Sequence, residues 1–76
     1  MLQTPEPDLS RLPAIFREQR ALSGMSYDDL AVQSGISRRT LINIATARYR
    51  GDLKTWMILA RTWGVSLDDL LASTWE

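Results

Sequence analysis

Residues 26–50, SYDDLAVQSGISRRTLINIATARYR, decide the fold of this chain. Ser26 is placed to cap a helix whose third residue, Asp29, can return a bond to it, which is the pattern of a capping box. This helix ends at Gly35, and a connection of two residues leads to Ser37, the N-cap candidate of the next helix. Because glycine adopts a positive φ without strain, so short a connection is typical of a helix-turn-helix.

The helix that follows Ser37 is expected over residues 38–47, and its two faces differ in chemistry. Leu41 and Ile44 lie three residues apart on a face that belongs to the core. The opposite face carries side chains that are related by three and four residues: Arg38, Arg39, Ile42 and Asn43. This second face is a candidate contact surface.

Positive charge is concentrated around this helix. Residues 30–51 contain four arginines (Arg38, Arg39, Arg48 and Arg50) and no acid, although the whole chain has a net charge of zero. Two arginines in the first turn of a helix oppose its dipole, at a cost of about 0.3–1 kcal/mol each. A solvated helix face is the simpler interpretation, but the cost and the missing acids favour a surface that binds nucleic-acid phosphates.

The flanking sequence predicts three more helices around one core. The first covers residues 11–22, with Ser10 as N-cap, the fourth follows an Asp52 cap to residue 63, and the fifth begins after Ser66. The residues expected on their core faces are Leu12, Ile15, Phe16 and Leu22, then Leu53, Trp56, Met57, Ala60 and Trp63, and finally Leu67, Leu70 and Leu71. We therefore expect a flexible tail over residues 1–9 and one all-α domain over residues 10–76.

Composition excludes several classes of function. The chain has no cysteine and no histidine, so thiolate metal sites, the commonest metal ligand and the usual general base are all missing. The adjacent acids that begin two of the helices are explained by the helix dipole, and no nucleophile–base set is present. We expect the protein to have no enzymatic activity, no metal, no cofactor and no membrane span, and to be located in the cytoplasm.

The stretches RALSGMSYDDLAVQSGISRRTLINI (20–44) and DLKTWMILARTWGVSLDDLL (52–71) resemble the Cro/CI/Xre family of helix-turn-helix proteins, which is also called lambda-repressor-like. The resemblance covers about residues 15–71. It implies a five-helix DNA-binding domain whose third helix enters the major groove. Such a domain acts as a sequence-specific transcriptional regulator, and a repressor of phage, plasmid or toxin–antitoxin type is the expected kind.

The resemblance also implies roles for individual residues. The base-contacting positions correspond to Arg38, Arg39 and Asn43, with Ile42 between them on the same face. The phosphate-contacting positions correspond to Ser26, Tyr27, Thr40, Arg48, Arg50 and Lys54.

Two positions depart from the family pattern. Family members often pair an arginine at the end of the first helix with a glutamate, but here Arg20 is present and the glutamate position is Ala45. We expect Arg20 to donate instead to carbonyls near the C-terminus of the third helix. The family often has proline where this chain has Gly51. This difference predicts a looser loop, in which the direction of the Arg48 and Arg50 side chains is not fixed.

A single recognition helix rarely binds tightly, so we expect a homodimer on a pseudo-palindromic operator of double-stranded DNA. The interface candidates are Ile58, Leu71, Ala72 and Trp75, although Trp75 serves equally well as a staple that closes the fifth helix onto the body. A protein-interaction module on the same fold, which binds a toxin or a larger regulator, remains the alternative.

Overall fold

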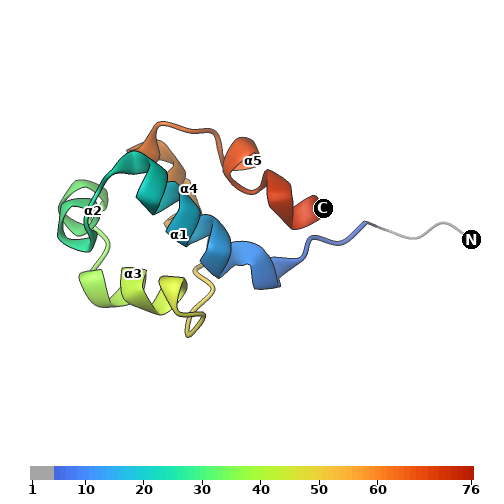
Figure 1. The fold of residues 1–76 in the computed structure, drawn as a ribbon, viewed down its shortest axis with the longest axis horizontal. Coiled ribbons are helices and arrows are strands. Elements are labelled where there is room, and N and C mark those ends of the chain that lie inside the picture. Colours follow the sequence, from blue (N-terminus) through green and yellow to red (C-terminus); the bar gives the residue numbers. More distant parts are fainter. Residues whose placement is uncertain (1–4) are drawn as a thin grey trace, which may run out of the picture.

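The computed structural model describes residues 5–76, which form a small bundle of short helices (Figure 1). The five α-helices are α1 (Leu12–Ser23), α2 (Tyr27–Ser34), α3 (Arg38–Ala45), α4 (Leu53–Trp63) and α5 (Leu67–Leu70), and two 3₁₀ turns are η1 (Leu9–Arg11) and η2 (Ala72–Trp75). No strand occurs within residues 5–76, so the predicted all-α, five-helix architecture is confirmed.

The starts of the last four α-helices follow directly from their capping residues. Ser26, Ser37, Asp52 and Ser66 each accept a hydrogen bond from a backbone N–H of the first turn. The capping box of α2 is complete, because the Asp29 carboxylate also accepts from the backbone N–H of Ser26. These caps confirm the N-cap residues predicted for α2 to α5.

The helix-turn-helix of α2 and α3 packs on α1 and α4 around one core. Gly35 takes a φ of +75° between α2 and α3, which turns the chain at the predicted position. The largest fully buried side chains come from four helices: Phe16, Leu30, Leu41, Ile44 and Leu59. Since Leu41 and Ile44 belong to this set, α3 is anchored by the face that the sequence assigns to the core.

The predicted core faces of α1 and α4 are partly wrong. Leu22 is 74% exposed because it lies at the end of α1, beyond the buried residues Leu12, Ile15 and Phe16. The core face of α4 is centred on Trp56, Leu59 and Ala60. Leu53 and Met57 are 66% and 54% exposed. Met57 follows Trp56 directly and is rotated from it by about 100°, so it points off the core face.

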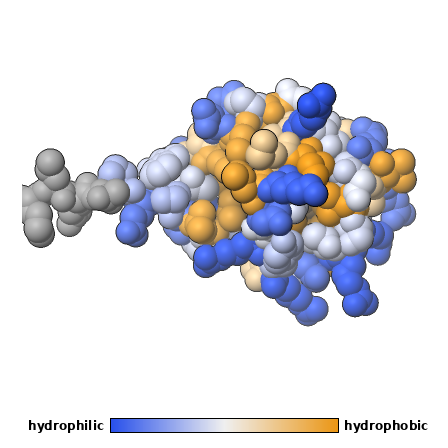
Figure 2. Space-filling model, turned by 180° about the vertical axis from the view of Figure 1, so that it is seen from behind, coloured by the Kyte–Doolittle hydropathy of each residue, from blue (hydrophilic) through white to orange (hydrophobic). Residues whose placement is uncertain are grey.

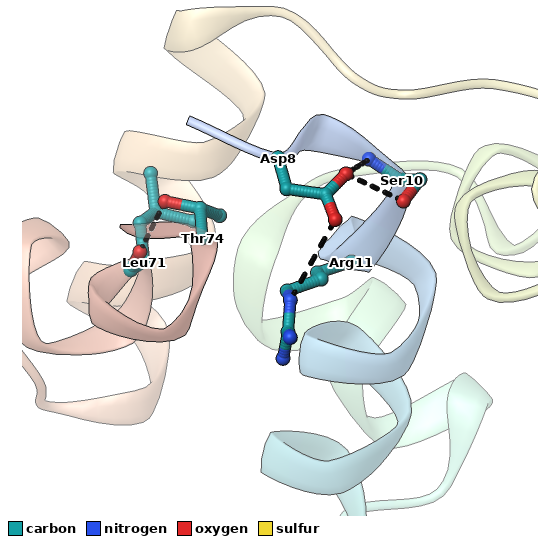
Figure 3. Close-up of polar contacts among 5 residues, drawn as sticks. All are labelled: Asp8, Ser10, Arg11, Leu71 and Thr74. Atoms are coloured by element: carbon teal, nitrogen blue, oxygen red, sulfur yellow. Dashed lines mark hydrogen bonds and ion pairs between the residues drawn. The ribbon is translucent and has the colours of Figure 1, made fainter. Parts of the chain in front are cut away.

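The N-terminal turn begins earlier than the sequence predicts (Figure 3). Asp8 is the N-cap of η1, and its carboxylate accepts bonds from the Ser10 backbone N–H at 3.1 Å and the Ser10 hydroxyl at 2.6 Å. Ser10 therefore lies inside η1, and the predicted Ser10 cap of the first α-helix is wrong, because α1 follows Arg11, which makes no side-chain capping bond. The Asp8 backbone N–H donates to the Thr74 carbonyl at 2.6 Å, which joins η1 to η2. The N-terminal 3₁₀ turn and its cap therefore include Asp8 and Leu9 of the predicted tail, and residues 1–4 of that tail lie outside the described residues.

None of the helices within residues 5–76 has the length and apolar character that a bilayer crossing requires.

Candidate nucleic-acid interface

The outward face of α3 borders a hollow of about 580 Å³. Four of the five residues that line it are the predicted base-contacting set, and the fifth is a predicted phosphate contact: Arg38, Arg39, Ile42, Asn43 and Arg48. Arg38, Arg39 and Arg48 are exposed, whereas Ile42 and Asn43 are half-buried. The structure thus brings three guanidinium groups, an amide and one apolar side chain together on one concave surface.

Both ends of α3 are held in place by hydrogen bonds. At the start, the Ser37 hydroxyl accepts from the Thr40 backbone N–H at 3.2 Å and lies 2.9 Å from the Thr40 hydroxyl. At the end, Arg17 of α1 donates through Nη1 to the Ala45 carbonyl at 2.6 Å. Sequence reasoning missed Arg17, because an exposed arginine on α1 gives no signal of a partner 28 residues away.

The third helix ends two residues before the predicted residue 47. The Thr46 hydroxyl donates to the Ile42 carbonyl at 2.8 Å. Ala47 has a φ of +65°, a left-handed conformation that a right-handed α-helix cannot include. The turn after α3 is closed by the backbone N–H groups of Arg48 and Tyr49, which both donate to the Asn43 carbonyl, at 2.8 and 3.2 Å.

The loop before α4 is held to that helix by a hydrogen bond, whereas Gly51 predicts a looser loop. The Trp56 indole donates through Nε1 to the Arg50 carbonyl at 2.7 Å. Gly51 has a φ of +79° and lies so close to this ring that an added Cβ would be 2.8 Å from Nε1. Glycine is therefore required here by the contact with Trp56.

The predicted phosphate contacts lie in several places. Arg48 borders the hollow, whereas Arg50 lines a separate cavity with Asp52 and Trp56. Lys54 is exposed on α4 and lines a groove on that helix. The structure therefore groups Arg48 with the outward face of α3 and leaves Arg50 and Lys54 on other surfaces.

Ser26 and Tyr27 occupy the first turn of α2 in different ways. Ser26 is exposed and its hydroxyl caps the helix, accepting from the Asp29 N–H at 3.0 Å. The ring of Tyr27 is half-buried and stacks on Phe16, with ring centroids 6.3 Å apart. Its aromatic part is therefore structural, while the backbone N–H groups of this turn carry the positive end of the helix dipole.

The partner predicted for Arg20 is wrong. Its Nη1 donates to the Met25 carbonyl at 3.0 Å, and its Cζ lies 4.4 Å from the centroid of the Tyr27 ring. The Nε atom is buried without a hydrogen-bond partner within residues 5–76. Because Arg20 lies near the end of α1, its side chain bonds to the connection between α1 and α2. The carbonyl at the end of α3 is bound by Arg17 instead.

Arg38 has an acidic neighbour that lies outside the acid-free stretch of sequence. Its Nε is 3.0 Å from Oδ1 of Asp28, in the first turn of α2. Both side chains are well exposed, at 60% for Arg38 and 81% for Asp28. Charge counted along the sequence could not find this ion pair, because the turn at Gly35 brings the two helix starts together.

A second surface, on α4 and α5, is mainly apolar, although Lys54 and Arg61 also line it. Its groove has a volume of about 750 Å³ and includes Leu53, Met57, Ile58 and Leu67. Figure 2 shows apolar side chains gathered on the side of the molecule opposite to that seen in Figure 1. Leu53 and Met57 lie four residues apart on α4, and this spacing is the same whether they face the core or the solvent. Sequence reasoning assigned them to the core and therefore missed this groove.

The predicted interface residues are divided between this groove and other surfaces. Ile58 is half-buried within the groove. Leu71 is half-buried against the core, Ala72 is exposed, and Trp75 is 60% exposed. Leu71 and Trp75 line a neighbouring cavity of about 410 Å³. Because more than half of Trp75 is exposed, its side chain packs only partly against the rest of the domain.

The fold and the hollow beside α3 define a class: a helix-turn-helix domain with a basic outward face on its second helix, α3. The family model described as Helix-turn-helix matches residues 16–70. An uncharacterized HTH-type transcriptional regulator of Methanocaldococcus jannaschii is 37% identical over 51 residues, which are 67% of this chain and 77% of that protein. The crystal structure of a hypothetical transcription factor, NHTF, from Neisseria superposes with a TM-score of 0.71 at 28% identity, over 93% of this chain and 84% of that one.

The chain belongs to this helix-turn-helix family of DNA-binding transcription regulators, as the Cro/CI/Xre resemblance predicts.

Proposed function

We propose that this protein is a sequence-specific regulator that places α3 in the major groove of double-stranded DNA. The observation that carries the proposal is the shared hollow, where Arg38, Arg39, Asn43 and Ile42 lie together on the face opposite the buried Leu41. A helix anchored on one side and rich in donors on the other fits the dimensions and the chemistry of that groove.

Base recognition is assigned to the side chains of the hollow. An arginine can donate two bonds to O6 and N7 of guanine, and an asparagine can pair with N6 and N7 of adenine. Arg38, Arg39 and Asn43 supply these groups, and Ile42 supplies an apolar surface for a thymine methyl group. Half-sites that contain guanine are therefore expected.

Phosphate contacts are assigned to the residues around the recognition face. Arg48 adjoins the hollow, and Arg50 and Lys54 extend the positive charge toward α4. Thr40, with Ser26 and Tyr27 at the start of α2, completes the set. These contacts position the domain, and the side chains of α3 specify the sequence.

The proposed biological form is a homodimer that occupies a pseudo-palindromic operator. The apolar groove on α4, with Ile58, and the neighbouring Leu71 and Trp75 form the proposed interface, to which the exposed Ala72 is added from the turn after α5. Bound in this way, the protein would block polymerase as a repressor of phage, plasmid or toxin–antitoxin type in the cytoplasm. The proposal assigns it no catalytic activity, metal or cofactor.

A second candidate function is supported by the same groove. A groove of about 750 Å³ with a mainly apolar lining is also suited to a partner protein such as a toxin or a larger regulator. In that case the domain is a protein-interaction module and the basic face plays a lesser part.

The salt dependence of DNA binding separates the two functions. We would titrate the protein into a labelled random-sequence duplex and follow fluorescence anisotropy from about 50 to about 200 mM salt. A DNA reader loses affinity steeply, by roughly 0.9 log units per log unit of salt for each phosphate contact. Absence of DNA binding at the lowest salt, by protein shown to be folded, would contradict the proposed function.

A further inference from the structure

The first turn of α2 supplies a carboxylate to the recognition face of α3. Asp28 lies one residue inside α2, and its Oδ1 atom is 3.0 Å from Nε of Arg38, at the first position of α3. Arg38 also lines the hollow with Arg39 and Asn43. This arginine therefore borders an acid on one side and the proposed base-reading surface on the other.

An acid at this place affects DNA binding in two opposite ways. Asp28 is 81% exposed, so its charge repels any phosphate that approaches the start of α2 and weakens binding to every sequence. The same charge restricts the long side chain of Arg38, which otherwise has many rotamers to lose when it binds a base. When a carboxylate occupies the Nε side of the guanidinium, the two Nη atoms remain free to donate to O6 and N7 of guanine.

We propose that Asp28 is a positioning residue for sequence specificity, which holds Arg38 by Nε so that its Nη edge is presented to a guanine. This inference rests on the proposed function, because it needs α3 to read bases. Asp28 lowers the affinity for DNA in general and increases the difference between the right base pair and the wrong ones at the position that Arg38 reads.

The chain contains a matched control for the charge of Asp28. The residues Ser26-Tyr27-Asp28-Asp29-Leu30 begin α2, and Ser66-Leu67-Asp68-Asp69-Leu70 begin α5 with the same cap and spacing. Asp68 occupies the position in α5 that Asp28 occupies in α2. Asp68→Asn therefore removes one negative charge from the same place in a helix, at a residue that makes no ion pair with Arg38 and does not line the hollow.

The experiment compares base discrimination among variants of the full chain. A preferred duplex is first selected with the wild-type protein, and each base pair of one half-site is then changed in turn. Dissociation constants for these duplexes and for a random-sequence duplex are measured for the wild type, Asp28→Asn, Asp68→Asn, Arg38→Ala and the double variant Asp28→Asn/Arg38→Ala. Circular dichroism verifies that each variant is folded.

The expected result is specific to one position. Arg38→Ala identifies the base pair that Arg38 reads by the loss of discrimination there. Asp28→Asn lowers discrimination at that pair by about three- to ten-fold, part of the preference that a bidentate contact provides, and tightens binding to the random duplex. Asp68→Asn leaves discrimination unchanged, and Asp28→Asn has no further effect on it when Arg38 is alanine.

Other outcomes overturn the inference and distinguish it from the proposed function. If Asp28→Asn tightens binding to all duplexes by the same factor, Asp28 acts only as a repelling charge. If its effect persists without Arg38, or if Arg38→Ala changes no base preference, the assigned partner is wrong while the DNA-reading function stands. If the wild type selects no duplex at all, the proposed function fails before the variants are compared.

Discussion

Arg38 and Arg39 are neighbours in sequence, but their surroundings differ. Arg38 lies at an ion-pair distance from Asp28, and Arg39 borders the hollow without an acid within 4.0 Å among residues 5–76. The sequence predicts that both arginines share the outward face of α3, because helical spacing determines it. It does not predict the acid beside one of them, since that contact depends on how α2 crosses α3.

Arg39→Ala is expected to affect sequence preference. Loss of a bidentate arginine contact costs about 1–3 kcal/mol of binding free energy and relaxes the preference at one base pair. Dissociation constants for the selected duplex and its single-base variants measure both effects. Equal weakening on every duplex would show that Arg39 contacts a phosphate instead.

Arg48→Ala is expected to act on all sequences alike. The side chain borders the hollow from the loop after α3, where it suits a flanking phosphate. Its removal should weaken binding to selected and random duplexes by similar factors and reduce the salt slope by about one unit. A change in base preference without a change in slope would contradict the assignment.

Gly51→Ala is expected to destabilise the protein more than Gly24→Ala. Both glycines have positive φ, so alanine adds roughly 1–2 kcal/mol of backbone strain at either site. At Gly51 the new Cβ would also lie 2.8 Å from Nε1 of Trp56, whereas at Gly24 it meets nothing within 4 Å. Thermal or urea unfolding of the two variants gives the comparison, and equal losses would mean that the Trp56 contact is unimportant.

At the scale of the elements, the sequence predicts the starts of helices better than their buried faces. Caps depend on residues three apart, so Ser26 and Asp52 could be identified locally. The buried face of α4 depends on what packs against it, and several apolar residues of this helix satisfy a helical spacing. The sequence therefore does not show that Leu59 is buried while Leu53 and Met57 are exposed.

The cap of α4 should make stability depend on pH below 4. Bonds from the Thr55 side chain and backbone N–H hold the pKa of the Asp52 carboxyl below its ordinary value of 3.8. A lowered pKa in the folded state adds stability above 3.8 that is lost as the pH falls through the folded-state value.

Asp52→Asn retains a capping side chain without the titration. The melting temperature of the wild type should therefore fall relative to that of Asp52→Asn as the pH is lowered from 5 to about 2. The hydroxyl of Ser10 lowers the pKa of Asp8 in the same direction, and this contribution cancels in the comparison because both proteins contain it. A difference that is constant with pH would contradict the account of this cap.

At the scale of the whole molecule, the two proposed functional surfaces lie on different helices. The basic hollow belongs to α3 and the turn after it, and the apolar groove belongs to α4 and the residues that lead to α5. The sequence predicts the first surface from charge and spacing. It predicts only Ile58 of the second, because the exposure of Met57 depends on the packing of α4.

Met57→Lys is expected to disrupt the proposed homodimer. Met57 is 54% exposed within the groove, so a charge there opposes apolar association without removing a core side chain. Val32→Lys is the control, since Val32 is 84% exposed on α2 and does not line the groove. Sedimentation at several concentrations should show a dimer for the wild type and Val32→Lys and a monomer for Met57→Lys. A wild type that stays monomeric at high concentration without DNA would contradict this interface.

The most direct test of the central claim, that α3 reads operator DNA, is selection of bound sequences from a random duplex pool at physiological salt. The account predicts enrichment of a palindrome whose half-sites lie about 10 bp apart or a multiple of that spacing, with loss of the preference in Arg39→Ala. Failure to enrich any sequence, by wild-type protein shown to be folded, would contradict it.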